Sequence, residues 1–184
     1  MKSDFKYRMM RRLNWVPRWV IFPTHRNQSV AEHSYGVATI AMWLMDNFHQ
    51  NGSMSQFRLS VLTRALEHDA DEAITGDSPS PTKHKDKEYY MSLSQEDVVV
   101  KMADCLEAWL FLSEELRMGN NYTQTIHIDL KQRMLPYWER FNYMPVGKRP
   151  SLQSFIMHFE QRWMQGPKKE DHPIIERMNE GVPF

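Results

Sequence analysis

Apolar residues recur along most of the chain at the spacing of a helix face, and alternating strand patterns are scarce. Within residues 30–48, apolar positions three and four apart form one continuous stripe on a helix. Ser29 and Glu32 have the spacing of a capping box, so this helix is predicted to begin near Val30, with His33 in its first turn. The pattern predicts an all-α protein.

Further helices are predicted by the same periodicity and by stop signals. A helix over residues 56–74 turns Leu59, Leu62, Leu66 and Ala73 inward. The two prolines within residues 78–82 make that segment a loop, because each removes a backbone donor and restricts the residue before it. The remaining helices are predicted over about residues 4–13, 94–118, 123–141 and 151–165.

Composition and charge narrow the class of protein. The 184 residues carry 23 basic and 23 acidic side chains, and this balance argues against polymeric nucleic acid or a membrane surface as a partner. Cys105 is the only cysteine, and no apolar run approaches the roughly 18 residues of a membrane helix. A cytoplasmic setting is therefore expected, which for a phage protein means the host cytoplasm. The length predicts one domain, over residues 1–165, followed by a polar tail over 166–184.

An acidic cluster follows the apolar run of the helix predicted over 56–74. On a continuous helix, His68, Asp69 and Glu72 share roughly one face. A bound cation would relieve their mutual repulsion, and carboxylates beside an imidazole suit Mn, Co, Zn or Fe better than calcium. The alternative is an ordinary acidic helix end that faces water.

Two more residues extend this cluster. His33 lies at the start of a neighbouring predicted helix, and Asp104 lies among apolar residues inside another. A buried aspartate must be paired or must bind a metal. Lys101, one turn earlier, could be its ion-pair partner, and His33 taken alone could be an ordinary surface residue. The pattern of one histidine, a His-Asp pair and a later aspartate on three helices nevertheless favours a shared metal site.

Four segments in order resemble the HD-domain metal-dependent phosphohydrolases. They are RW at residues 18–19, SVAEHS at 29–34, HDADEAITGDSPSPTK at 68–83, and VVKMADCLEAWLFLSEELRMGNN, which ends at residue 121. Within that superfamily they are similar to the bacterial 5'-deoxyribonucleotidases and equally to the phage dATP triphosphohydrolases. The resemblance implies a single HD-domain helical bundle.

The resemblance also implies roles for individual residues. Four of them match metal ligands for a divalent ion, with Zn, Co or Mn expected and Mg possible: His33, His68, Asp69 and Asp104. Glu72 would orient or deprotonate the attacking water, and Asp77 would hold the water or protonate the leaving group. The candidate substrate-binding residues are Arg18, Trp19, Ile21, Pro81, Lys83 and Lys101. The implied partner is a small-molecule deoxynucleotide, and relatives of this kind are homo-oligomers.

Two reactions fit this site. A dATP triphosphohydrolase would cleave the 5'-phosphoester bond and release deoxynucleoside plus triphosphate, whereas a 5'-deoxynucleotidase would release phosphate from a dNMP. Only 26 residues separate Asp77 from Asp104, fewer than in the bacterial monophosphatases, and Lys83 and Lys101 add positive charge near the site. These features favour the triphosphate reaction. A non-catalytic nucleotide-binding module and a helical nucleic-acid-binding protein are the other classes considered, and the complete ligand set and the zero net charge argue against them.

Overall fold

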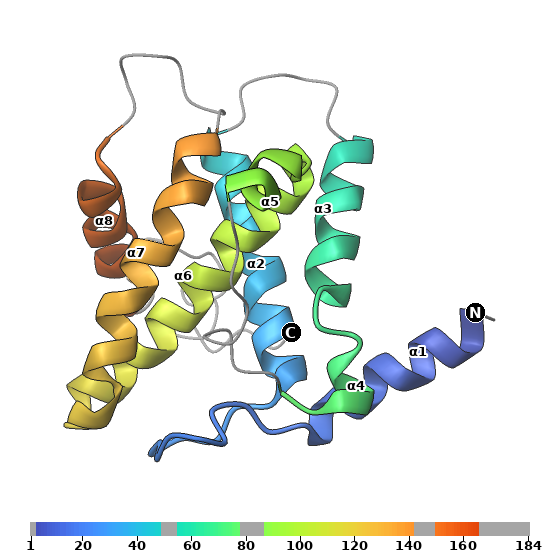
Figure 1. The fold of residues 1–184 in the computed structure, drawn as a ribbon, viewed down its shortest axis with the longest axis horizontal. Coiled ribbons are helices and arrows are strands. Elements are labelled where there is room, and N and C mark those ends of the chain that lie inside the picture. The colour runs from blue at the N-terminus through green and yellow to red at the C-terminus, as the bar shows by residue number, and fades with distance from the viewer. Residues whose placement is uncertain (1–2, 49–54, 78–86, 142–149, 166–184) are drawn as a thin grey trace, which may run out of the picture. The chain divides into compact units, whose positions relative to one another are not determined.

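The computed structural model describes residues 3–48, 55–77, 87–141 and 150–165 (Figure 1). The chain divides into two compact units, residues 1–149 and residues 150–184. The predicted loop over 78–82, with Pro81 and Lys83, and the predicted tail over 166–184 lie outside the described residues. The predicted domain boundary at residue 165 therefore stays a prediction.

Helices make up nearly all of the described structure, which confirms the all-α prediction. The only β pairing in the described ranges is an isolated bridge between Pro17 and Ser29. None of the described helices is both long and apolar enough to cross a membrane. The helices are α1 (Ser3–Arg12), α2 (Val30–Phe48), α3 (Ser55–Glu67), α4 (Glu72–Thr75), α5 (Lys87–Ser92), α6 (Gln95–Arg117), α7 (Gln124–Arg140) and α8 (Leu152–Met164), with short 3₁₀ turns η1 (Leu13–Trp15) and η3 (Asn121–Thr123).

Capping residues define where the two central helices begin. At α2, the backbone N–H of Ser29 donates to Glu32 (2.6 Å), and the N–H of Glu32 donates to the Ser29 hydroxyl (3.2 Å). At α6, Ser94 and Asp97 form the same reciprocal pair. These bonds satisfy helix donors that have no partner inside the helix. The predicted starts of both helices are confirmed.

The core of the first unit lies around α6, which packs against α2, α3 and α7, while α2 also packs against α3 (Figure 1). The helices interlock through apolar side chains that are almost completely buried. Each such side chain stabilises the fold by about 1.5–3 kcal/mol. Fully buried residues on the two central helices include Val37, Ile40, Leu44, Met102, Leu106 and Phe111.

The helix predicted over residues 56–74 differs from the observed one. α3 ends at Glu67, and a turn over residues 68–71 separates it from α4. The predicted inward face is also wrong, because Leu59 is 64% exposed and Leu66 is 37% exposed, whereas Val61 and Ala65 are fully buried. Both sets of residues have helical spacing, so periodicity alone did not identify the face that α2 and α6 cover.

Two short helices were not predicted as separate elements: the residues of α4 were assigned to the helix over 56–74, and α5 was not predicted. Ala73 of α4 is buried in a small apolar cluster with Leu13 and Val30, which fixes this single turn beside the start of α2. α5 has six residues and ends shortly before the cap of α6. Such short elements carry too few turns for a periodic signal. In the second unit, α8 begins at a Ser151 cap, close to its predicted start.

Candidate active site

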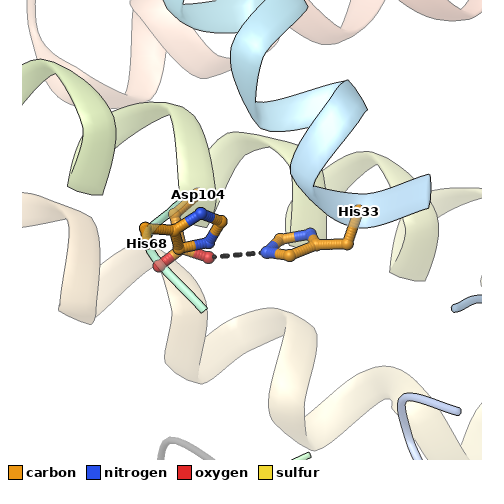
Figure 2. A group of neighbouring side chains, drawn as sticks. All are labelled: His33, His68 and Asp104. Carbon is orange, nitrogen blue, oxygen red and sulfur yellow. Dashed lines mark hydrogen bonds and ion pairs between the residues drawn. The ribbon is translucent and has the colours of Figure 1, made fainter. Parts of the chain in front are cut away.

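Three elements bring two histidines and an aspartate together. His33 comes from the first turn of α2, His68 from the turn after α3, and Asp104 from α6 (Figure 2). One ligand atom from each lies within 4.8 Å of those of the other two. Three of the four predicted ligands therefore form a cluster that could hold a metal ion, and the fourth, Asp69, lies beside it.

The His68 imidazole is oriented by the backbone of α3, the helix that precedes it. Its Nδ1 lies 2.7 Å from the carbonyl oxygen of Ala65, where it donates to one of the last carbonyls of α3. This bond leaves Nε2 on the side of the cluster. Nε2 is 3.0 Å from Oδ2 of Asp69, but it is buried and makes no aligned hydrogen bond among the described residues.

His33 is completely buried and is contacted by carboxylates on both sides. Its Nε2 lies 3.1 Å from Oδ1 of Asp104 and 3.8 Å from Oδ2 of Asp69, while Nδ1 contacts Oε2 of Glu107. Burial, the largest influence, and the charge of Arg18 both lower the pKa of His33, but the carboxylates of Glu107 and Asp104 raise it above the ordinary value overall. The surroundings therefore favour positive charge at this position.

Asp104 of the cluster and the neighbouring Asp69 are held as carboxylates. Burial is the largest influence on Asp104 and opposes its charge, but Lys101, His33 and His68 bring its pKa well below the usual value. Asp69 behaves in the same way, because contact with His68 outweighs burial and lowers its pKa. Lys101 Nζ lies 3.3 Å from Oδ2 of Asp104, so the ion pair considered from the sequence exists alongside the cluster. The Asp104 charge in turn raises the pKa of Lys101.

The donor set fits a borderline divalent ion. Both imidazoles have Nδ1 engaged and Nε2 directed to the cluster, and two carboxylates lie beside them. Imidazole suits Zn, Cu, Fe and Ni, and carboxylate widens the choice to harder ions such as Mn. A buried Nε2 of His68 without an aligned hydrogen bond is the kind of atom that a metal would satisfy.

Glu72 follows a turn after α3 and does not lie on the continuous helix predicted from the sequence. Tight bonds close the turn, from the N–H of Ala70 to the carbonyl of Glu67 (3.0 Å) and from the N–H of Glu72 to the carbonyl of Asp69 (3.0 Å). Glu72 is the first residue of α4 and is only 7% exposed. The continuous helix predicted over these residues is therefore wrong, and the catalytic role of Glu72 stays a prediction.

Arg18 and Trp19 lie on a loop that is held against α6. Trp19 has a left-handed backbone (φ 62°), which is uncommon for a non-glycine residue. Its backbone N–H donates to Oδ2 of Asp77 (3.1 Å), which ties the loop to the segment after α4. The Trp19 ring stacks on Phe111 at a centroid distance of 5.4 Å, and the Arg18 guanidinium lies 5.1 Å from the Trp19 centroid.

The predicted substrate-binding residues Arg18, Lys101 and Ile21 lie in different surroundings. Arg18 has Nη1 3.5 Å from Oε2 of Glu107, so it already faces one carboxylate. Lys101 lines a pocket of about 420 Å³ next to His68. Ile21 is 58% exposed and does not line that pocket. The complete lining of the pocket is Arg64, Glu67, His68, Tyr89, Leu93, Asp97, Val100 and Lys101.

Sequence reasoning did not single out Glu107, Gln28 or Glu115. Glu107 contacts His33, Arg18 and Gln28. Glu115 accepts bonds from the backbone of the Arg18–Trp19 loop at His25 and Arg26. One signal was available: Glu107 and Glu115 lie three and eleven residues after Asp104, which places them on adjoining faces of one helix.

In sequence, this chain is similar to known 5'-deoxynucleotidases. The family model for YfbR-like 5'-deoxynucleotidases matches residues 5–95. A 5'-deoxynucleotidase of Yersinia pseudotuberculosis is 31% identical over 185 residues, covering 80% of this chain and 87% of that protein. A 5'-deoxynucleotidase of Yersinia pestis is 31% identical over 147 residues, covering 60% of this chain and 73% of that protein.

Solved structures with the same fold include two HD-domain phosphohydrolases. The cyanophage S-2L HD phosphohydrolase DatZ, bound to dA and one catalytic Zn²⁺ ion, has a TM-score of 0.63 and 20% identity, covering 91% of this chain and 99% of that one. An HD-domain phosphohydrolase from Listeria innocua has a TM-score of 0.60 and 17% identity, covering 96% of each chain. The fold is therefore that of HD-domain phosphohydrolases. The sequence relatives show that this chain belongs to the 5'-deoxynucleotidase family, as the sequence resemblance implied.

Proposed function

We propose that the protein hydrolyses the 5'-phosphoester bond of 2'-deoxynucleotides, with dATP as substrate and deoxyadenosine plus triphosphate as products. The observation that carries the proposal is the convergence of His33, His68 and Asp104 beside a loop that presents Arg18 and Trp19. A cluster of imidazoles and carboxylates suits a hydrolytic metal, and an arginine next to an aromatic ring suits a nucleotide.

His33, His68, Asp69 and Asp104 are proposed to hold one divalent ion, with Zn, Co or Mn preferred and Mg possible. Such an ion supplies Lewis acidity, which polarises a phosphoryl oxygen and makes a water molecule more acidic. Zinc is supported by the catalytic Zn²⁺ of the cyanophage neighbour. The two imidazoles, each held through Nδ1, support a borderline metal over calcium.

Glu72 is proposed to take the proton from the attacking water, and Asp77 to hold the water or to protonate the leaving 5' oxygen. The near-complete burial of Glu72 supports this role, because a carboxylate in a water-poor position is a stronger base. Asp77 is joined to the backbone of Trp19, which supports a position beside the sugar. Arg18 is proposed to bind phosphate and Trp19 to pack against the nucleoside, with Ile21, Pro81 and Lys83 as further contacts.

The choice of triphosphate rests on the pocket beside His68. Lys101 and Arg64 both line it, and a triphosphate needs more cations than a monophosphate does. Adenine is supported by the dA bound to the cyanophage neighbour. The alternative, release of phosphate from a dNMP, is favoured by the names of the Yersinia relatives.

One panel of substrates tests the reaction. Each dNMP, each dNTP and the matching ribonucleotides are incubated with Zn, Co, Mn or Mg, and phosphate and triphosphate are measured separately. Triphosphate from dATP in equal amount to deoxyadenosine is the expected result. Phosphate from dAMP with dATP untouched would overturn the dATP assignment and support the alternative.

The same proposal covers the kind of partner, the oligomeric state and the location of the enzyme. The substrate is a small molecule and not polymeric nucleic acid or a membrane, which the zero net charge supports. A homo-oligomer in the cytoplasm is proposed on the resemblance to the family. Light scattering of the purified protein measures the oligomeric state directly, and a monomeric mass would contradict that part.

A further inference from the structure

One carboxylate contacts both the candidate metal centre and the candidate substrate loop. Oε2 of Glu107 contacts Nδ1 of His33 and lies 3.5 Å from Nη1 of Arg18. Oε1 accepts a hydrogen bond from Nε2 of Gln28 (2.7 Å). The Glu107 side chain is only 12% exposed, so these contacts take place largely away from water.

The bond to Gln28 extends the influence of Glu107 to the Trp19 ring. Because Nε2 of Gln28 donates to Glu107, its Oε1 points the other way, where it accepts from Nε1 of Trp19 (3.0 Å). Gln28 is 5% exposed and cannot turn its amide over without losing both bonds. Glu107 therefore determines which end of Gln28 faces the indole.

The neighbouring helix leaves room for Glu107 by means of a glycine. Gly36 lies inside α2, where glycine costs about 1 kcal/mol relative to alanine. A Cβ at this position would lie 2.7 Å from Cγ and 3.2 Å from Oε1 of Glu107. The glycine thus permits the close approach of the carboxylate to α2.

We propose that Glu107 is a positioning residue that holds His33, Arg18 and Trp19 in one arrangement and so aligns the metal centre with the nucleotide. The inference rests on the proposed function for the roles of these three residues. Glu107 is neither one of the proposed metal ligands nor one of the proposed substrate-binding residues. It keeps a proton on Nδ1 of His33, which leaves Nε2 for the metal, and it keeps Arg18 and Trp19 in their positions on the loop.

Glu107→Gln tests the proposal because it keeps the shape and removes the charge. The new amide oxygen can still accept from His33, but the new amide nitrogen faces the amide nitrogen of Gln28. We expect the Kd for Co²⁺ to rise by about 10–100-fold, the range seen for outer-shell partners. We expect KM for the nucleotide to rise about tenfold, because Trp19 loses its buried acceptor.

A compensating change separates positioning from simple loss of packing. In Glu107→Gln/Gln28→Glu, the new amide nitrogen donates to the new carboxylate, whose other oxygen accepts from Trp19. KM should therefore return to within about threefold of wild type, whereas the Kd for Co²⁺ stays raised because His33 still faces a neutral amide. Gln28→Glu alone should raise KM, since it opposes two carboxylates.

Gly36→Ala provides a second perturbation with no change in charge. The added methyl group must displace Glu107, so both the Kd for Co²⁺ and KM should rise in the same direction as in Glu107→Gln. Glu114→Gln is the matched control, since Glu114 lies on the same helix, is 47% exposed and pairs with the exposed Arg26 at 3.1 Å. Urea unfolding in EDTA monitors the stability of each metal-free variant.

The results separate the inference from the proposed function. A wild-type Kd for Co²⁺ in both Glu107→Gln and Gly36→Ala would overturn the inference, whatever the enzyme hydrolyses. Failure of the Gln28→Glu change to lower KM in the double variant would also overturn it. Absence of deoxynucleotide hydrolysis by the metal-loaded wild type would overturn the proposed function alone, and the Kd comparison would still decide the role of Glu107 at the metal centre.

Discussion

Glu115 offers the sharpest test of how the substrate loop is held. Glu115 lies on α6, and its side chain is 1% exposed. Its carboxylate accepts from four donors outside this helix. The donors are the backbone N–H groups of His25 (2.8 Å) and Arg26 (3.1 Å), Nδ2 of Asn120 (2.7 Å) and Nδ1 of His25 (3.2 Å). Glu115→Gln keeps the size of the side chain but replaces one acceptor oxygen with a donor.

The magnitude follows from these contacts. A hydrogen bond to a charged group contributes about 1.5–3 kcal/mol, and a buried donor left without a partner costs about 1–3 kcal/mol. Glutamine can serve the donors with one oxygen only, so at least one charged bond is lost. We expect the free energy of unfolding to fall by about 3 kcal/mol. For a chain of this size that corresponds to a fall in Tm of about 6–12 °C.

Urea unfolding of the wild type, Glu115→Gln and Glu114→Gln measures the effect. Glu114 precedes Glu115 and is exposed, so its substitution makes the same chemical change and should alter stability by less than about 0.5 kcal/mol. KM should rise only in Glu115→Gln, because the loop that it holds carries Arg18 and Trp19. Equal urea midpoints for the two variants would refute the reasoning.

Glu115→Gln should also change how the stability of the protein depends on pH. Burial, the largest influence, raises the pKa of Glu115, but the bonds from Asn120, His25 and Arg26 lower it below the usual value overall. A carboxyl group whose folded pKa is lowered stabilises the protein above its unfolded pKa, about 4.3, and this stabilisation is lost as pH falls through the folded pKa. Wild-type stability should therefore fall more steeply below about pH 4.3 than that of Glu115→Gln. Parallel curves would contradict the assignment.

Three further predictions concern the centre itself. Chelation should lower the Tm, because an ion at 100 times its Kd stabilises the folded state by about 2.7 kcal/mol, and an unchanged melting curve in EDTA would place the ion elsewhere. Glu72→Gln should lower kcat by at least about 100-fold while Co²⁺ still binds, and full turnover would exclude Glu72 as the base. Lys101→Ala should raise KM for dATP more than for dAMP, since its charge adjoins the pocket beside His68; an equal effect on both would count against a triphosphate site.

Local signals in the sequence were enough for much of the fold. The Ser29–Glu32 and Ser94–Asp97 caps lie within four residues of chain and act through backbone donors, so they predicted the starts of α2 and α6 correctly. Periodicity predicted the long helices. It did not identify the buried face of α3, because that face depends on which neighbours α3 meets.

The candidate site, like the fold, was predicted in part from the sequence. The identities of His33, His68, Asp69 and Asp104, and the chemistry that imidazole and carboxylate can perform, were determined by the sequence and its family resemblance. The ligand atoms of His33, His68 and Asp104 do lie close together, although a turn after α3, and not a continuous helix, precedes Glu72.

Only the tertiary structure decided how these residues are held. Glu107 and Gln28 lie 79 positions apart, and Glu115 lies 90 positions from His25, so no local pattern links them. Their partners are chosen by the packing of α6 against α2 and the loop before it, which buries carboxylates where they must be paired. The sequence thus determined which groups can do the chemistry, and long-range packing determined their orientation, because burial makes each unpaired charge costly.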